Sequence, residues 1–114
     1  MEIEISNNKL RKAIEDDGRR VKTYGADMAK KIAVRMASLR AAENLADFWP
    51  PNQLPERCHE LKGQLSGVFS VDLVHPYRLL FQPFDIERQP DDDERGWWLK
   101  ITHIEITDVE DTHG

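Results

Sequence analysis

The chain has 114 residues, of which 39% are hydrophobic and 32% are charged, a composition typical of one folded domain that we expect to span residues 1–114. Its formal net charge of -5 argues against a protein that is drawn to nucleic acid by overall charge. Cys58 is the only cysteine, which excludes an intramolecular disulfide, and no apolar run is long enough to cross a membrane, so the expected location is the cytoplasm.

The first half of the chain predicts one strand followed by two helices. Residues 2–6 alternate charged and apolar side chains, which is typical of a half-buried strand. Apolar residues then recur at helical spacing until Asp16, Asp17 and Gly18, where we expect this short helix to end. After Gly25 the spacing predicts an amphipathic helix whose apolar stripe contains Met28, Ile32, Met36 and Leu39.

The basic residues of the second helix lie mostly outside its apolar stripe. We therefore expect its cations on a solvated face, namely Lys30, Lys31, Arg35 and Arg40. The segment that follows, residues 49–56, contains three prolines and cannot continue a helix. It is predicted to be an ordered connector.

Alternation with a period of two begins after the connector and predicts a hairpin. Residues 68–74 and 77–82 alternate apolar and polar side chains, and the His75–Pro76 pair between them is predicted to form the turn. If the helices packed on one face of a mostly antiparallel sheet, the apolar stripe of the helices and the apolar side chains of the strands would both be buried. The predicted fold class is therefore α+β, with the N-terminal strand and the two helices packed on one face of that sheet.

A polar stretch and a last strand complete the predicted elements. Residues 91–96 are expected to form a solvated loop tip, because four consecutive acids occur there. A strand is predicted over residues 97–108, and its apolar pattern changes phase by one residue, which suggests a bulge near Thr102 or His103.

Histidines are the first candidates for chemistry, because imidazole can both give and take a proton near neutral pH. His75 in the predicted turn and His103 in the last strand are expected to be ordinary surface or packed residues. His59 lies where the connector enters the sheet, a position typical of sites. His113 is the penultimate residue.

A metal site or a cysteine nucleophile has little support from the spacing. Cys58, His59 and the acids at 91–93 are potential ligands, but the sequence has no C-x-x-C or H-x-x-x-H pair. Nothing in the sequence identifies a base for Cys58. We therefore expect no metal and no cofactor.

Two stretches of the sequence resemble the HigB-like toxins of the RelE/ParE superfamily, the toxic partners of type II toxin-antitoxin pairs. The first runs from HELKG at residues 59–63 to the aromatic-arginine pair Tyr77-Arg78 and the LLF that follows it. The second is the C-terminal E-D-T-H at residues 110–113. The helix after Gly25 also looks like that of the family, so the resemblance covers about residues 18–114.

The resemblance implies a small RelE-like fold and a ribosome-dependent mRNA endoribonuclease. The nucleophile of such an enzyme is the 2′-hydroxyl of the RNA, so the chemistry needs acid-base groups and charge stabilisation but no metal. Positions that match the family's catalytic residues are His59, Asp111 and His113. Lys62 and Arg78 match basic positions that bind the scissile phosphate.

The same resemblance implies a set of partners. They are a helix-turn-helix antitoxin of the HigA type, the ribosome and its mRNA, and operator DNA only through the antitoxin; no membrane is implied. Two alternatives stay open: a ParE-like toxin that inhibits DNA gyrase, and a non-catalytic binding or suppressor member of the fold. The acidic net charge, and Thr112 where the family has tyrosine, favour the second alternative.

Overall fold

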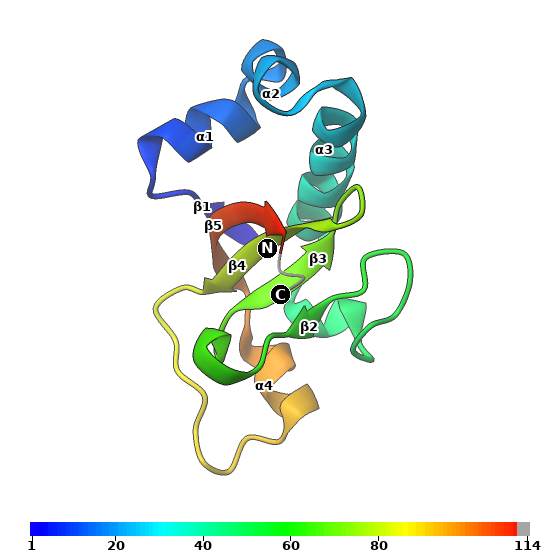
Figure 1. Cartoon of the computed structure of the whole chain (residues 1–114). Coiled ribbons are helices and arrows are strands. Elements are labelled where there is room, and N and C mark those ends of the chain that lie inside the picture. Colours follow the sequence, from blue (N-terminus) through cyan, green and yellow to red (C-terminus); the bar gives the residue numbers. More distant parts are fainter. Residues whose placement is uncertain (112–114) are drawn as a thin grey trace.

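A five-stranded sheet forms the centre of the computed structural model, which describes residues 1–111 (Figure 1). The strand order is β1-β5-β4-β3-β2; β1 runs parallel to β5, and the other neighbours are antiparallel. This arrangement confirms the predicted α+β class and the mostly antiparallel sheet. The elements are β1 (Glu2–Glu4), α1 (Asn8–Glu15), α2 (Asp17–Tyr24), α3 (Ala26–Ala41), β2 (His59–Glu60), β3 (Phe69–Asp72), β4 (Tyr77–Pro83), α4 (Glu94–Lys100) and β5 (His103–Asp111), with short 3-10 turns η1 (Leu45–Phe48) and η2 (Gly63–Leu65).

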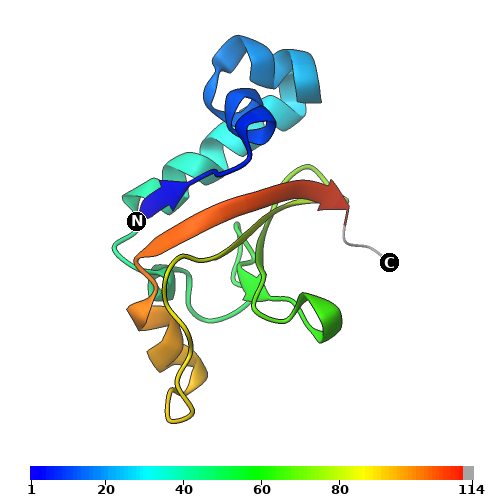
Figure 2. The same cartoon turned by 90° about the vertical axis from the view of Figure 1, so that its left-hand side faces the viewer.

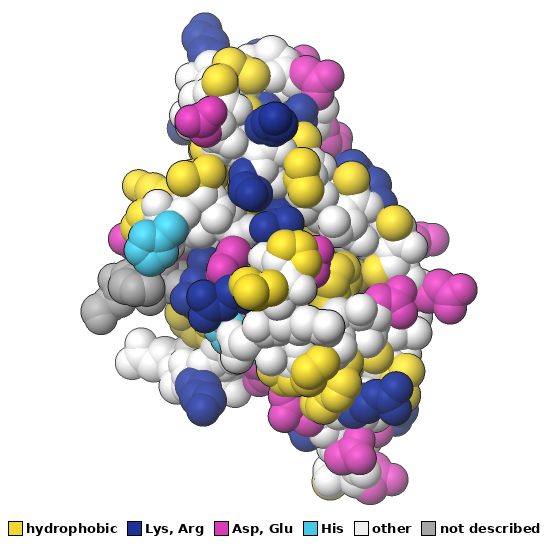
Figure 3. All heavy atoms as spheres, turned by 90° about the vertical axis from the view of Figure 1, so that its right-hand side faces the viewer, with side chains coloured by type: hydrophobic (Ala, Val, Ile, Leu, Met, Phe, Trp, Pro, Cys, Tyr) yellow, Lys and Arg dark blue, Asp and Glu magenta, His cyan; other side chains and the backbone are white. Residues whose placement is uncertain are grey.

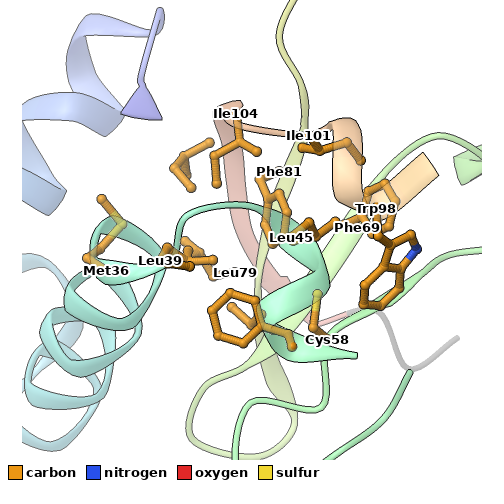
Figure 4. Close-up of a cluster of buried hydrophobic side chains, with 14 of the residues drawn as sticks. Met36, Leu39, Leu45, Cys58, Phe69, Leu79, Phe81, Trp98, Ile101 and Ile104 are labelled. Carbon is orange, nitrogen blue, oxygen red and sulfur yellow. The ribbon is translucent and has the colours of Figure 1, made fainter. Parts of the chain in front are cut away.

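The hydrophobic core lies between α3 and one face of the sheet. Figure 2 shows α1, α2 and α3 together on this side, with α4 at the opposite end of the molecule. Ile32, Met36 and Leu39 of the predicted apolar stripe of α3 are buried. The inward side chains of β3, β4 and β5 pack against them (Figure 4). Residues that α4 and its C-cap contribute to the same core are Trp97, Trp98 and Ile101.

A second N-terminal helix, α2, was not predicted. The Asp16–Gly18 interruption is real, but Asp16 serves both helices: its backbone ends α1, and its Oδ1 accepts a hydrogen bond from Arg19 N at 2.8 Å, which caps α2. None of the residues of α2 is buried. The helix therefore carries no apolar stripe that a pattern search could detect.

The predicted solvated tip over residues 91–96 is right for residues 91–93, which lie in a turn, but the strand predicted from residue 97 is wrong up to residue 102. Asp93 Oδ1 accepts from Gly96 N at 2.7 Å and so caps α4, which runs to Lys100. The phase change near Thr102 thus marks the passage from helix to strand. The bulge of the sheet lies further on, because Leu80 pairs with Asp108 and Phe81 with Ile106, which leaves Thr107 as the extra residue.

The expectation that Arg35 is solvated is also wrong. Only 5% of Arg35 is exposed, although it lies on the helix that was predicted to present its cations to water. Within residues 1–111, none of the helices is long and apolar enough to cross a membrane.

Candidate functional site

His59 occupies the short edge strand β2, opposite Ser70 of β3. Its Nδ1 lies 2.8 Å from the backbone oxygen of Arg57. A carbonyl oxygen only accepts hydrogen bonds, so Nδ1 must carry the proton, and the neutral ring then has its lone pair on Nε2. Because the ring is only half-buried, Nε2 is a base that an incoming ligand can reach.

Arg78 meets His59 across β3. Its Nη1 lies 3.5 Å from His59 Nε2, and its Nε lies 3.8 Å from Asp72 Oδ1. Arg57 approaches the same carboxylate, with 3.7 Å between Arg57 Nε and Asp72 Oδ2. One acid is therefore shared by two guanidinium groups at loose distances, and both cations keep the capacity to bind an anion.

Arg35 fixes the connector that carries Arg57 and His59. Its Nε donates to the backbone oxygen of Asp72 at 2.7 Å, and its Nη2 donates to that of Pro55 at 3.2 Å. The amide of Asp72 in turn donates to Glu56 O at 2.8 Å. The buried guanidinium thus ties α3, the connector and the end of β3 together at the point where the site begins.

Lys62 lies three residues after His59 and lines the same surface hollow, whose volume is about 590 Å³. The turn after β2 uses Gly63, whose φ of 69° is a left-handed conformation that favours glycine. This turn leaves Lys62 exposed at the rim. Figure 3 shows Lys and Arg side chains beside a recessed histidine on this side of the molecule.

A second hollow of about 280 Å³ adjoins the pair of guanidinium groups. It adds residues that were not proposed from the sequence: Arg57 at its edge, and His75 and Tyr77 from the β3–β4 turn. Tyr77 is 44% exposed, an unusual state for an aromatic ring at the start of a central strand. The only signal for Arg57 in the sequence was its place two residues before His59.

The structure does not bring all five expected site residues together. His59, Lys62 and Arg78 gather on one side of the sheet, whereas Asp111 pairs with Tyr77 at the end of β5. Successive side chains of a strand point to opposite faces, so Glu110, the partner of Arg78, shares its face, and Asp111 belongs to the other. His113 lies outside the described residues, and the catalytic roles of both stay predictions.

Cys58 is fully buried beside the site. Burial raises the pKa of its thiol well above the ordinary value, and the charge of Glu56 raises it further. The thiol therefore stays protonated at neutral pH and is unsuited to act as a nucleophile. Within the described residues, no three His, Cys, Asp or Glu side chains converge as a metal site would require.

The sheet order and the α3 cover define a small α+β fold in which helices cover one face of a mostly antiparallel sheet. The chain matches no protein-family model, and no curated protein matches its sequence. A solved structure that is similar is a YoeB/ParE toxin from Agrobacterium tumefaciens, with a TM-score of 0.55 and 13% sequence identity over 99% of this chain and 100% of that chain. At this identity the similarity establishes the shared fold.

Proposed function

We propose that this chain is the toxin of a type II toxin-antitoxin pair and cleaves mRNA on the ribosome. The shared fold with the YoeB/ParE toxin structure supports the class. The observation that carries the activity is His59, whose Nδ1–H is held by a carbonyl while Nε2 faces Arg78 at 3.5 Å. A base beside a cation is the arrangement that RNA cleavage by an internal 2′-hydroxyl needs.

In the proposed reaction, His59 Nε2 takes the proton of the 2′-hydroxyl as that oxygen attacks the adjacent phosphorus. The bond to the 5′-oxygen breaks, which leaves a 2′,3′-cyclic phosphate and a 5′-hydroxyl that must gain a proton. Arg78 and Lys62 would stabilise the charge on the phosphorane oxygens. His113 is the proposed source of the proton for the leaving oxygen, and Asp111 is proposed as a group that orients it.

The loose sharing of Asp72 supports this role for Arg78. A phosphate can replace a carboxylate that lies at 3.8 Å more readily than one held by a close bidentate pair. Asp72 would still have Arg57 as a partner, so binding of a phosphate to Arg78 would not leave the carboxylate unpaired. The proposed partners are the ribosome with its mRNA, in the cytoplasm, and a HigA-like helix-turn-helix antitoxin that inhibits the toxin.

The decisive experiment compares His59→Ala with His103→Ala. His103 Nε2 lies 3.1 Å from Glu4 Oε1, and its ring lies beside that of Phe84, away from the site. His103→Ala is therefore a control for the removal of a histidine outside the site. We expect His59→Ala to lower the rate of mRNA cleavage on programmed ribosomes by about 10²- to 10⁴-fold. His103→Ala should stay within about twofold, since it contacts no proposed substrate group.

Growth arrest in cells that express the chain gives a second measurement. We expect arrest with the wild type and His103→Ala, relief with His59→Ala, and 5′-hydroxyl ends at the cleaved sites. Arrest with intact mRNA and inhibited gyrase would overturn the proposal in favour of a gyrase toxin. No arrest with any form would favour a non-catalytic member.

A further inference from the structure

Two surface hollows meet between β2 and the segment that joins β4 to α4. The first is the hollow that His59 and Lys62 line, and the second, of about 450 Å³, continues it toward Trp97. Three residues line both: Glu60, Ser66 and Arg88. The two hollows therefore adjoin along these three side chains, and together they are here called the Arg88 groove.

Arg88 is fixed at the junction of the two hollows. Its Nε and Nη2 both donate to the backbone oxygen of Asp92, at 3.2 and 3.1 Å. The carboxylate of Asp92 is used elsewhere, because Oδ1 accepts from Lys100 Nζ at 2.6 Å and Oδ2 accepts from Gln89 N at 2.9 Å. Among residues 1–111 the Arg88 guanidinium donates to no carboxylate oxygen, although its charge lies close enough to Asp92 to help lower the pKa of that carboxyl.

Three acids line the Arg88 groove, namely Glu60, Glu87 and Glu94. Glu60 Oε2 is held by the amide of Gly67 at 3.0 Å. Glu94 lies in the first turn of α4, where the backbone dipoles favour a negative charge. The cations on the same walls are Lys62, near His59, and Arg88, further along.

The far part of the Arg88 groove has an apolar wall. Pro83, Ile86 and Trp97 line it, and Ile86 is 39% exposed although it is a large hydrophobic residue. A nucleobase has an apolar face that such side chains cover, and its sugar-phosphate needs a cation close by. The groove offers both over the span between Lys62 and Arg88.

We propose that the Arg88 groove binds the RNA nucleotide next to the cleaved phosphate, with Arg88 holding its phosphate and the Pro83–Ile86 wall covering its base. This site rests on the proposed function, since it extends the same RNA beyond His59. In this proposal the loop from Phe84 to Asp93 orients Arg88 toward the RNA. The backbone oxygen of Asp92 holds Arg88, and Lys100 holds the side chain of Asp92.

The test is a titration of the full-length protein with a 2′-O-methyl RNA trinucleotide, which binds without being cleaved, followed by NMR of the arginine Nε–H and backbone amide signals. Arg88→Gln is compared with Arg95→Gln, a substitution of the same charge at an exposed residue of α4 that lines neither hollow. We expect saturable shifts at Arg88 Nε–H and Gly67 N–H in the wild type. Arg88→Gln should weaken binding by about 5- to 20-fold and lower the slope of log Kd against log salt by about 1, while Arg95→Gln changes binding less than about twofold.

Arg88→Lys separates charge from loop structure, because it keeps the cation but loses the paired bonds to Asp92 O. Binding that is partly restored in this variant supports a phosphate contact. Equal effects of Arg88→Gln and Arg95→Gln, or the absence of a saturable shift in the wild type, would overturn the groove as a subsite. If the wild type still cleaves mRNA and His59→Ala does not, that failure leaves the proposed function standing.

Discussion

The two faces of β3 and β4 carry different side chains. On the side of α3, Phe69, Val71, Leu79 and Phe81 are all fully buried. On the other side, Asp72 and Arg78 pair across the two strands and meet His59 from β2. A hairpin of a few residues per strand therefore supplies both the wall of the core and the floor of the site.

The position of the site therefore depends on the packing of the core. The side-chain period of a strand is two, so a register slip of one residue would turn Arg78 toward α3 and Leu79 toward solvent. Apolar burial excludes that slip. Substitutions of the apolar residues on the core face should then lower stability, whereas substitutions of the charged residue Arg78 on the site face should lower activity and leave the fold intact.

The largest expected effect comes from the core face. Phe81→Ala removes a fully buried ring that stacks on Phe69 with 5.9 Å between ring centroids. We expect the free energy of unfolding in urea to fall by about 3–5 kcal/mol. Gln82→Ala, at the next and exposed position of the same strand, should change it by less than about 0.5 kcal/mol. Similar losses for the two variants would contradict the division of the faces.

The next effect tests how the core is joined to the site. Arg35→Met keeps the length of the side chain but leaves the backbone oxygens of Asp72 and Pro55 without their donor. We expect a loss of about 2–3 kcal/mol in the free energy of unfolding, measured with urea. Arg40→Met, at an exposed position of the same helix, is the control and should stay within about 0.5 kcal/mol. If the stability of Arg35→Met were unchanged, the hydrogen bonds of Arg35 would not be what holds the connector.

A smaller effect, and one on activity, is expected on the site face. Arg78→Gln should reduce mRNA cleavage on ribosomes by about 10- to 100-fold, or about 1.4–2.7 kcal/mol in transition-state free energy, because one cation at the phosphate is lost. Its stability should change little, since Asp72 keeps Arg57 as a partner. Arg40→Gln removes the same charge away from the site and should leave cleavage unchanged. Loss of folding in Arg78→Gln would mean that the site face also carries stability.

The smallest effect concerns the loop beyond both faces. The hydrogen bond from Lys100, followed by that from Gln89 N, lowers the pKa of Asp92, and the bond to Asp92 raises the pKa of Lys100. A lowered carboxyl pKa stabilises the folded state above the pKa of the unfolded chain, and this contribution disappears as the pH falls through the folded-state value. The wild type should therefore exceed Asp92→Asn in stability at neutral pH and approach it in acid, as unfolding midpoints across this pH range would measure. The contribution of Lys100 should vanish only as the pH rises through its raised pKa.

The sequence predicted the parts of the fold that have a strong side-chain period. The stripe of α3 and the alternation in β3 and β4 follow directly from what each element buries. The helix α2 buries nothing, and α4 is short and begins with acids that look like a solvated loop. Both depend on single capping aspartates, Asp16 and Asp93, whose effect is local and leaves no period.

Part of the candidate site could be predicted, and part could not. His59, Lys62 and Arg78 were proposed from the resemblance, and the structure brings them to one side of the sheet. The burial of Arg35 was missed because helical spacing assigns charged residues to the solvated face. Its burial depends on the backbone oxygens that accept its hydrogen bonds, and these come from distant segments of the chain. Arg88 was missed for a similar reason, since its orientation comes from Asp92 O in the folded loop.

The reactivity of the Cys58 thiol can be used to measure how often the connector beside the site unfolds. It is fully buried one residue before His59, and its raised pKa keeps it unreactive while the connector is closed. The rate at which a small alkylating reagent modifies it therefore reports how often the connector separates from β3, by local or global unfolding. A lower alkylation rate of Cys58 in the presence of RNA or an antitoxin would show that the ligand slows this opening next to the proposed base.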